Sequence, residues 1–452
     1  MLRFRISSLI ILAWLPFASL GQHSPAQSTE TTSFTLSQAV SHALRRQETL
    51  QNLRIDDQVN NQKVREYLAK WLPQLTGNLE FRYNAIRPTS ILPGEIAGRP
   101  GENVPVQFGT RYNTNASLDL DWTVFAPQIG PDLKLARLNI ELARKDLQRN
   151  EVETRFMVTR AYLAVLLSKE NLANQQVNLQ RQQTLVQELE ARVKASQAEP
   201  FDLERAQLQL NNLQVAVERS ATAVAQSLLS LKYQMAYPLD RELVLVDSLL
   251  LKEYQEEAAL LSPQSVQPEG RVEWKIQAIQ LDQRILELRK ARNAYIPTVS
   301  FFAQTGSQFQ SNRFNLFDFS NAWFGAVFLG ARVQVPLFDG LQRDAKIKQA
   351  RLALAQSRLT QQALNRQLEH EIHDAWLSYA TAVRHLTEQK NNIIIAERAL
   401  NRIQARYFLD QETYREVENL RADLQQAQNN YFITLYDLAV ARLSLLKAMG
   451  SL

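Results

Sequence analysis

The stretch that decides the fold is residues 201–231, FDLERAQLQLNNLQVAVERSATAVAQSLLSL, whose pattern returns 214 residues later in residues 415–445, REVENLRADLQQAQNNYFITLYDLAVARLSL. In both copies apolar residues recur at steps of three and four, or at a whole heptad, which is the seam spacing of a coiled coil. The seams fall on matching positions: Leu203, Ala206, Leu210, Leu213, Val217, Val224 and Leu231 in the first copy, and Val417, Leu420, Leu424, Ala427, Tyr431, Leu438 and Leu445 in the second. A shared register over this length indicates an internal duplication.

The composition is that of long helices. The 452 residues include only 13 Gly and 15 Pro, and 51 Lys+Arg nearly balance 46 Asp+Glu. Charges of both signs alternate along the helices, which is typical of a solvated surface and not of a nucleic-acid site. The mean hydropathy of -0.29 argues against helical membrane spans. The absence of Cys excludes disulfides, thiolate metal ligands and cysteine nucleophiles.

The first residues are typical of an export signal. Arg3 and Arg5 precede an apolar segment, 6–20, and small residues follow at Ser19 and Gly21. We therefore predict a signal peptide at 1–21 and a flexible, polar leader at 22–34.

Two segments of the first half alternate strictly between apolar and polar residues. They are 75–85 and 112–124, separated by a loop rich in Gly and Pro, and they predict a β-hairpin at about 74–125. About ten tilted residues are enough for a strand to cross a bilayer. Tyr83, Tyr112 and Trp122 lie near the strand ends, where a membrane interface favours aromatic residues. After an export signal, this pattern favours a membrane barrel over a soluble hairpin.

Both halves follow the order helix, strand, strand, long helix, heptad helix. The predicted units are a first repeat at 35–239, a linker at 240–270 and a second repeat at 271–452. The first repeat holds a helix at 36–71 and coiled-coil helices at 132–237, and the second holds a hairpin at 298–338 and coiled-coil helices at 343–448. Four strands cannot close a barrel, because unpaired edges in lipid are costly. Three copies would supply twelve strands. We therefore predict a mainly α protein with a transmembrane β-barrel.

The chain resembles the TolC-type outer-membrane efflux proteins over nearly all of the predicted mature region. The resemblance rests on the duplicated plan, on Leu72-Pro73 and Ile296-Pro297 before the first strand of each half, and on the heptad helices with Ala206-Gln207 and Ala427-Gln428. It implies a homotrimer with a twelve-stranded barrel in the outer membrane of a Gram-negative cell. A long periplasmic α-helical barrel would continue this barrel, with an equatorial region built partly from residues 240–270.

The resemblance also implies a function. The chain would be the passive exit duct of a tripartite efflux or secretion system. Its partners would be a periplasmic membrane-fusion adaptor and an inner-membrane pump of the resistance-nodulation-division or ABC type. No cofactor, enzyme activity or nucleic acid is implied.

In this family the duct closes at the periplasmic tips, where the helix pairs turn. The resemblance places Ser196, Gln197, Asp410 and Gln411 at these adaptor-contacting tips.

Four further positions match the constriction and its latch. Glu416 and Asn419 match two acidic positions that line the pore, so a ring of three carboxylates is expected in place of six. Tyr407 matches an aromatic residue of the closing latch, and Glu412 stands where some members carry Arg. The alternative for Glu416 is an ordinary solvated helix residue.

Other readings of the sequence remain open. His370 and His373 lie three residues apart on one helix, which differs from the four-residue spacing of the zincin motif, and we predict no metal site. The alternative functions are an exported periplasmic structural coiled coil or adaptor-like protein, and the same channel dedicated to polypeptide secretion or metal-ion efflux. The duplicated plan disfavours an adaptor, and four Met without Cys disfavour a soft-metal relay.

Overall fold

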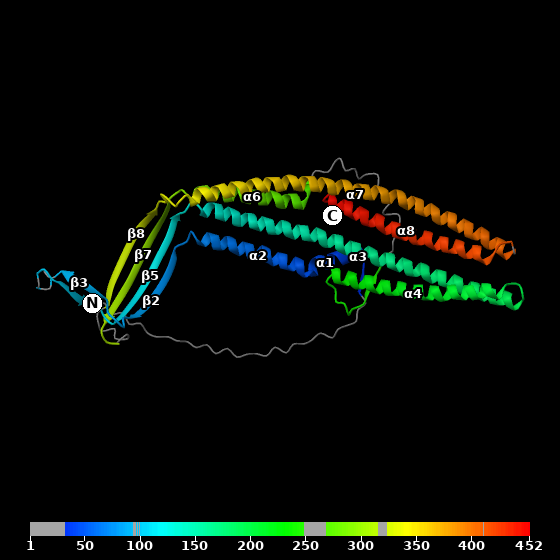
Figure 1. Cartoon of the computed structure of the whole chain (residues 1–452), viewed down its shortest axis with the longest axis horizontal. Coiled ribbons are helices and arrows are strands. Elements are labelled where there is room, and N and C mark those ends of the chain that lie inside the picture. Colours follow the sequence, from blue (N-terminus) through cyan, green and yellow to red (C-terminus); the bar gives the residue numbers. More distant parts are fainter. Residues whose placement is uncertain are drawn as a thin grey trace.

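The computed structural model describes residues 32–93, 96, 98, 100–247, 268–314, 323–409 and 411–452. Within them, one elongated body carries a β-sheet at one end and long helices that run away from it (Figure 1). The predicted signal peptide, nearly all of the leader and most of the 240–270 linker lie outside the described residues. The prediction of a mainly helical chain with a set of paired strands is confirmed.

Seven α-helices account for most of the described chain. Their bounds are α1 (Leu36–Arg46), α2 (Glu48–Ala69), α3 (Ile129–Lys194), α4 (Pro200–Gln234), α6 (Val272–Asn293), α7 (Gln342–Phe408) and α8 (Tyr414–Ala448). The low content of Gly and Pro permits helices of 66 and 67 residues in α3 and α7.

The single helix expected at 36–71 is wrong, because it is divided at Gln47. There the backbone is extended, with ψ 122, and α1 and α2 lie on either side. Thr35 caps α1 in a reciprocal arrangement with Gln38. Ala39 and Ala43 of α1 are fully buried, so the short helix packs into a local core while α2 continues along α3.

The sheet contains four antiparallel strands in the order β2 (Gln74–Tyr83), β5 (Tyr112–Phe125), β7 (Thr298–Ser311) and β8 (Phe324–Gln334). Its register aligns the apolar positions: Leu75 pairs with Leu120, Trp122 with Phe301, and Ala303 with Leu329. One face is therefore mostly apolar across the four strands, because side chains alternate along each strand. β2 and β8 form the two edges of an open sheet.

The opposite face is mostly polar on β2, β5 and β7, but it also carries Phe302, Phe324 and Phe328. Asn78 donates to Asp119 at 2.6 Å on this face. Phe302 also lies there, beneath the guanidinium of Arg332. A Cβ at Gly330 would come within 2.5 Å of the Phe302 ring, so Gly330 provides the space in which this ring lies. Phe302 therefore lies on the mostly polar face, where its neighbours in the register are Asp121 and Gly330.

The loop between β2 and β5 contains a second hairpin, whereas the sequence predicted an irregular loop. β3 (Thr89–Pro93) pairs with β4 (Asn103–Gln107). Pro93 and Pro105 were read as loop residues, but both strands of a two-stranded ribbon are edges, where a missing N–H is tolerated. Two more short strands were not predicted, the parallel pair β1 (Thr32–Phe34) and β6 (Leu243–Leu245). Three residues are too few to show a period.

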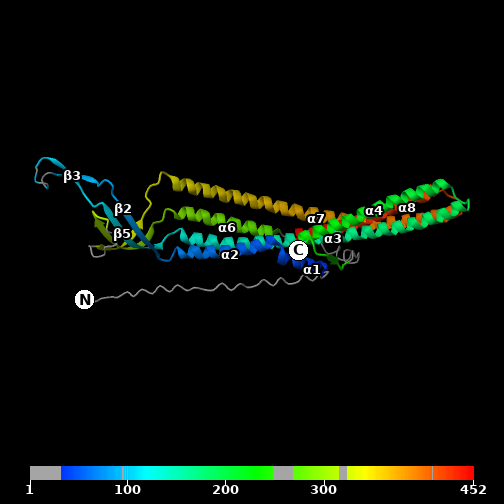
Figure 2. The same cartoon turned by 90° about the horizontal axis from the view of Figure 1, so that it is seen from below.

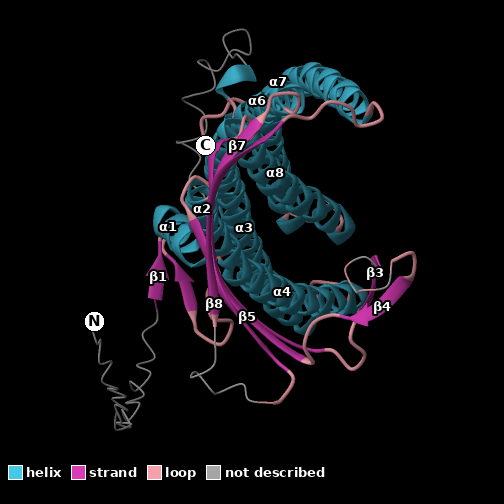
Figure 3. Cartoon of the chain, turned by 90° about the vertical axis from the view of Figure 1, so that its left-hand side faces the viewer, coloured by secondary structure: helices cyan, strands magenta, loops and turns pink. Residues whose placement is uncertain are grey.

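The helices next to the sheet keep the order of the strands. α2 packs on α3, α3 on α6 and α6 on α7. Viewed along the long axis, the sheet and the helices follow one curved wall (Figure 3). Farther from the sheet, α3 pairs with α4 and α7 pairs with α8, and we call these pairs the first and the second helical hairpin. The two helical hairpins reach the far end side by side (Figure 2).

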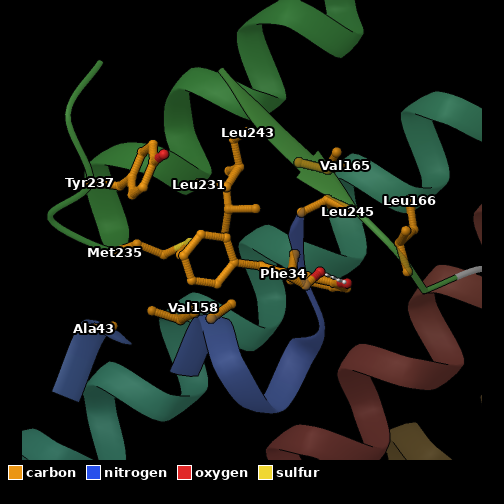
Figure 4. Close-up of a cluster of buried hydrophobic side chains, with 12 residues drawn as sticks. Phe34, Ala43, Val158, Val165, Leu166, Leu231, Met235, Tyr237, Leu243 and Leu245 are labelled. Carbon is orange, nitrogen blue, oxygen red and sulfur yellow. Dashed lines mark hydrogen bonds between the residues drawn. The ribbon is translucent and has the colours of Figure 1, made fainter. Parts of the chain in front are cut away.

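A buried cluster at the middle of the molecule joins the N-terminal segment to the first helical hairpin, α3 and α4. Phe34, Val158, Leu231, Met235 and Leu245 pack together there (Figure 4). The Tyr162 hydroxyl donates to the Asp247 carboxylate at 2.9 Å, and the same carboxylate accepts from the Leu36 amide at 2.8 Å. Burial, and then the bond to Asp247, raise the pKa of Tyr162 above its ordinary value. This cluster ties β1 and α1 to the coiled coil.

Candidate functional site at the hairpin tips

The turn between α3 and α4 is closed by a residue with left-handed backbone. Ser196 has φ 57, and the next amide, Gln197 N, donates to Arg192 O at 2.8 Å. A left-handed residue that ends a helix in this way is usually Gly, because a Cβ is strained there. Both residues are exposed, at the end of the molecule farthest from the sheet.

The turn between α7 and α8 repeats this geometry 214 positions later. Gln411 N donates to Arg406 O at 3.0 Å, the counterpart of the bond between Gln197 and Arg192. Gln411 is exposed, and Asp410 lies outside the described residues. Three of the four residues assigned to the tips are therefore described, and each lies at a turn.

The two residues assigned to the latch face different partners. The Tyr407 ring lies under the Arg192 guanidinium of the first hairpin, 5.4 Å from it, and 6.2 Å from the Tyr414 ring. Glu412 instead forms an ion pair with Arg406 of its own hairpin at 3.1 Å. Tyr407 therefore bridges the hairpins, whereas Glu412 braces a single turn.

Glu416 and Asn419 are both exposed and lie one helical turn apart on α8. Glu416 is in the first turn of α8, where a carboxylate interacts favourably with the helix N-terminus. Asn419 lines a cavity of about 700 Å³ between the two hairpins. Glu188, Glu397, Glu418 and two arginines, Arg181 and Arg421, also line it. The cavity wall thus carries charges of both signs.

A buried link between the hairpins was missed by the sequence analysis. Tyr414 is 2% exposed and is buried among Leu185, Val186, Leu189 and Ala206 of the first hairpin. Its hydroxyl donates to the Glu418 carboxylate at 2.8 Å. Desolvation, and then the charge of Glu418, raise the pKa of Tyr414 above its ordinary value.

A side-chain bridge extends this link along α8. Arg421 donates to the Gln182 side-chain oxygen at 3.1 Å, and Gln182 donates in turn to Ala206 O at 3.0 Å. Gln182 is 3% exposed, so its amide depends on these partners. We define the clasp as Tyr414, Glu418, Arg421 and Gln182. One feature of the sequence could have pointed to the clasp, because two of its residues differ between the halves. Pro200 and Gln207 of the first half stand where the second half has Tyr414 and Arg421.

The described residues contain no group of three or more His, Asp or Glu side chains able to hold a metal, and His370 and His373 are exposed on α7. None of the helices described is long and apolar enough to cross a membrane.

Comparisons with known proteins agree with this architecture. Residues 275–451 match the family described as outer membrane efflux protein. A segment of 122 residues is 26% identical to the outer membrane efflux protein BepC of Brucella suis biovar 1 (strain 1330), and this match spans 27% of each chain.

Solved structures share the fold over almost the whole length. The structure of CusC, described for its folding and transmembrane channel formation, has a TM-score of 0.75 at 17% identity and covers 96% of this chain and 95% of its own. VceC, an outer membrane protein of Vibrio cholerae, has a TM-score of 0.71 at 16% identity and covers 92% of this chain and 96% of its own.

These matches support the resemblance predicted from the sequence. The solved structures show that the chain shares the fold of CusC and VceC. Residues 275–451 therefore resemble outer membrane efflux proteins, and the chain shares the fold of the solved structures over almost its whole length.

Proposed function

We propose that this chain is the outer-membrane channel of a tripartite export system and passively conducts substrates out of the periplasm. The observation that carries the proposal is the sheet. It has one apolar face and one mostly polar face, and its edges are β2 and β8. An amphipathic sheet with free edges becomes stable in lipid when further strands close it into a barrel.

Three copies would complete that closure. β8 of one copy would pair with β2 of the next, giving twelve strands with the apolar face toward lipid and the polar face toward a lumen. The long helices would continue the same wall into the periplasm. The curvature of sheet and helices in a single wall supports this arrangement (Figure 3).

The tips would be the gated and adaptor-contacting end of the duct. Glu416 and Asn419 would line the constriction, and Tyr407, with Glu412 bracing its turn, would belong to the latch. Ser196, Gln197, Asp410 and Gln411 would meet the periplasmic membrane-fusion adaptor. A pump of the resistance-nodulation-division or ABC type would deliver the substrate from the inner membrane. The exposed turns and the cavity between the hairpins support these assignments.

The proposal is tested by fractionation and complementation with the full chain. We expect a heat-modifiable oligomer that leaves the outer membrane only with detergent. In a strain that lacks its own exit duct, expression should restore resistance to exported compounds when the cognate adaptor and pump are present. Release by salt or carbonate alone would contradict the barrel and favour an exported periplasmic coiled-coil protein. Rescue of peptide secretion or metal resistance, without rescue of drug resistance, would assign a different cargo.

A further inference from the structure

The mostly polar face of the sheet carries three phenylalanines. Phe324 and Phe328 belong to β8, and Phe302 belongs to β7. In the register, Phe302 lies opposite Gly330, and Phe328 lies opposite Gln304. Directly paired residues of antiparallel strands point to the same face, so the three rings share the polar face although their strands also have an apolar one.

The three rings form a row along β7 and β8. Phe324 and Phe328 are four residues apart, which separates them by about 14 Å along β8. Phe302 lies over Gly330, two residues beyond Phe328, and continues the row by about 7 Å. We define the aromatic track as Phe302, Phe328 and Phe324. Phe302 is near the start of β7, which follows α6, so the track leads from the helical end of the sheet toward its far end.

Packing within the chain explains one ring of the track. Phe302 is partly buried over Gly330, and the Arg332 guanidinium lies 5.3 Å from its ring. Phe324 and Phe328 are instead 68% and 58% exposed. Pairing of β8 with a further strand would cover its backbone edge and leave this face open. Apolar side chains scattered singly over a surface need no explanation, whereas an exposed row of them marks a binding surface.

Carboxylates lie beside the track on the same face. Asp121 is exposed and pairs with Phe302 in the register, and Asp119 lies two strands from Phe328 in the adjacent row. Neighbouring strands are about 4.8 Å apart, so each carboxylate is near a ring. Against these two carboxylates stands the guanidinium of Arg332, and the surroundings of the track therefore favour a cation.

We infer that the aromatic track binds substrates in transit and selects organic cations that carry aromatic rings. Such a cation stacks a ring on Phe302 or Phe328, and its charge is attracted by the ring faces and by the neighbouring carboxylates. Weak binding at successive rings lets a solute pass from one to the next, because conduction needs sites that release what they bind. The inference rests on the proposed channel, and it adds the chemical class of the substrate.

The test compares two organic cations of equal charge and similar size. Tetraphenylphosphonium carries aromatic rings, whereas tetrabutylammonium carries alkyl chains. Each is added to planar bilayers that contain the full chain as a heat-modifiable oligomer. We expect tetraphenylphosphonium to block the current with longer interruptions, and with a lower apparent Kd, than tetrabutylammonium.

Substitutions separate the rings from the charge. Phe302→Leu and Phe328→Leu keep an apolar side chain, and each should raise the apparent Kd of tetraphenylphosphonium by about twofold to fivefold while leaving that of tetrabutylammonium unchanged. Phe328 is mostly exposed, so its variant has little packing to lose. The matched control is Phe301→Leu, on the opposite face of β7, which should change neither value. Asp121→Asn should weaken the block by both cations, because it removes a charge and no ring.

A conducting oligomer that both cations block equally would overturn the track and leave the channel standing. So would a block by tetraphenylphosphonium that is unchanged in the double variant F302L/F328L. Ring-dependent block by maltohexaose, without block by tetraphenylphosphonium, would also overturn the inference and assign the track to oligosaccharides. An unsubstituted chain that gives no conductance would overturn both the track and the channel.

Discussion

The two helical hairpins share a seam and a turn geometry, yet they differ in the residue that follows the turn. α4 begins at Pro200 and its next residue, Phe201, is 62% exposed. α8 begins at Tyr414, which is 2% exposed and buried in the other hairpin. Both hairpins therefore keep the pairing between their own helices, whereas the first residue after the turn is buried against the other hairpin in the second half only.

The largest effect should come from removing the buried ring of the clasp. Tyr414→Ala should destabilise the tip by about 3–5 kcal/mol, as for other buried aromatic residues. In planar bilayers the variant should show a higher conductance or open probability than the unsubstituted chain. Phe201→Ala, at the exposed position of the first hairpin, should cost less than about 0.5 kcal/mol. Equal losses of stability in the two variants would contradict the proposed difference between the two helical hairpins.

The polar part of the clasp should have an intermediate effect. Arg421→Ala leaves the buried Gln182 oxygen without its donor and should cost about 1–3 kcal/mol in urea unfolding. Gln207→Ala, at the matching position of the first half, should be nearly neutral because Gln207 is exposed. A neutral Arg421→Ala variant would show that the apolar contacts of Tyr414 hold the hairpins together without the bridge.

The raised pKa of Tyr414 predicts a loss of stability in alkali. The unfolded chain releases the hydroxyl proton near pH 10, whereas the folded chain retains it to higher pH. The contribution of this group is therefore complete below about pH 10 and is lost as pH rises through the raised folded pKa.

Tyr162 also has a raised pKa, so a control is needed. The difference in unfolding free energy between the unsubstituted chain and Tyr414→Phe, measured from pH 8 to 11, isolates the clasp. A difference that is independent of pH would contradict the prediction.

The smallest effect concerns the first turn. Ser196→Gly should stabilise the chain by up to about 1 kcal/mol, because Gly adopts the left-handed backbone without a clash. Ala236→Gly is the matched variant at the other end of the same hairpin, where φ is 51 and the second half already has Gly450. Thermal unfolding of both variants measures the strain at each turn, and a loss of stability in either would mean that the turn is not strained.

Sequence reasoning recovered most of the architecture, because long elements leave long periodic signals. The heptads placed α4 and α8, strict alternation placed β2 and β5, and the repeated order of elements placed β7 and β8. It failed where the signal was short or non-local. β1 and β6 have three residues each, and the break at Gln47 leaves the helical pattern on both sides unchanged.

The candidate site was only partly accessible from the sequence. Turn residues such as Ser196 and Gln197 follow from the ends of the heptad pattern. The burial of Tyr414 in the other hairpin depends on how two coiled coils pack side by side, which no local period encodes. The contact between Arg421 and Gln182 joins residues 239 positions apart. The roles of Glu416 and Asn419 at a constriction stay predictions.

Single-channel recording tests the central claim most directly. The full chain, extracted with detergent from outer membranes as a heat-modifiable oligomer, is reconstituted in planar bilayers beside the Tyr414→Ala variant. The account predicts discrete conductance steps for both proteins, with larger or more frequent openings in the variant. An oligomer that produces no steps in either form would contradict the claim that this chain forms a channel closed at its hairpin tips.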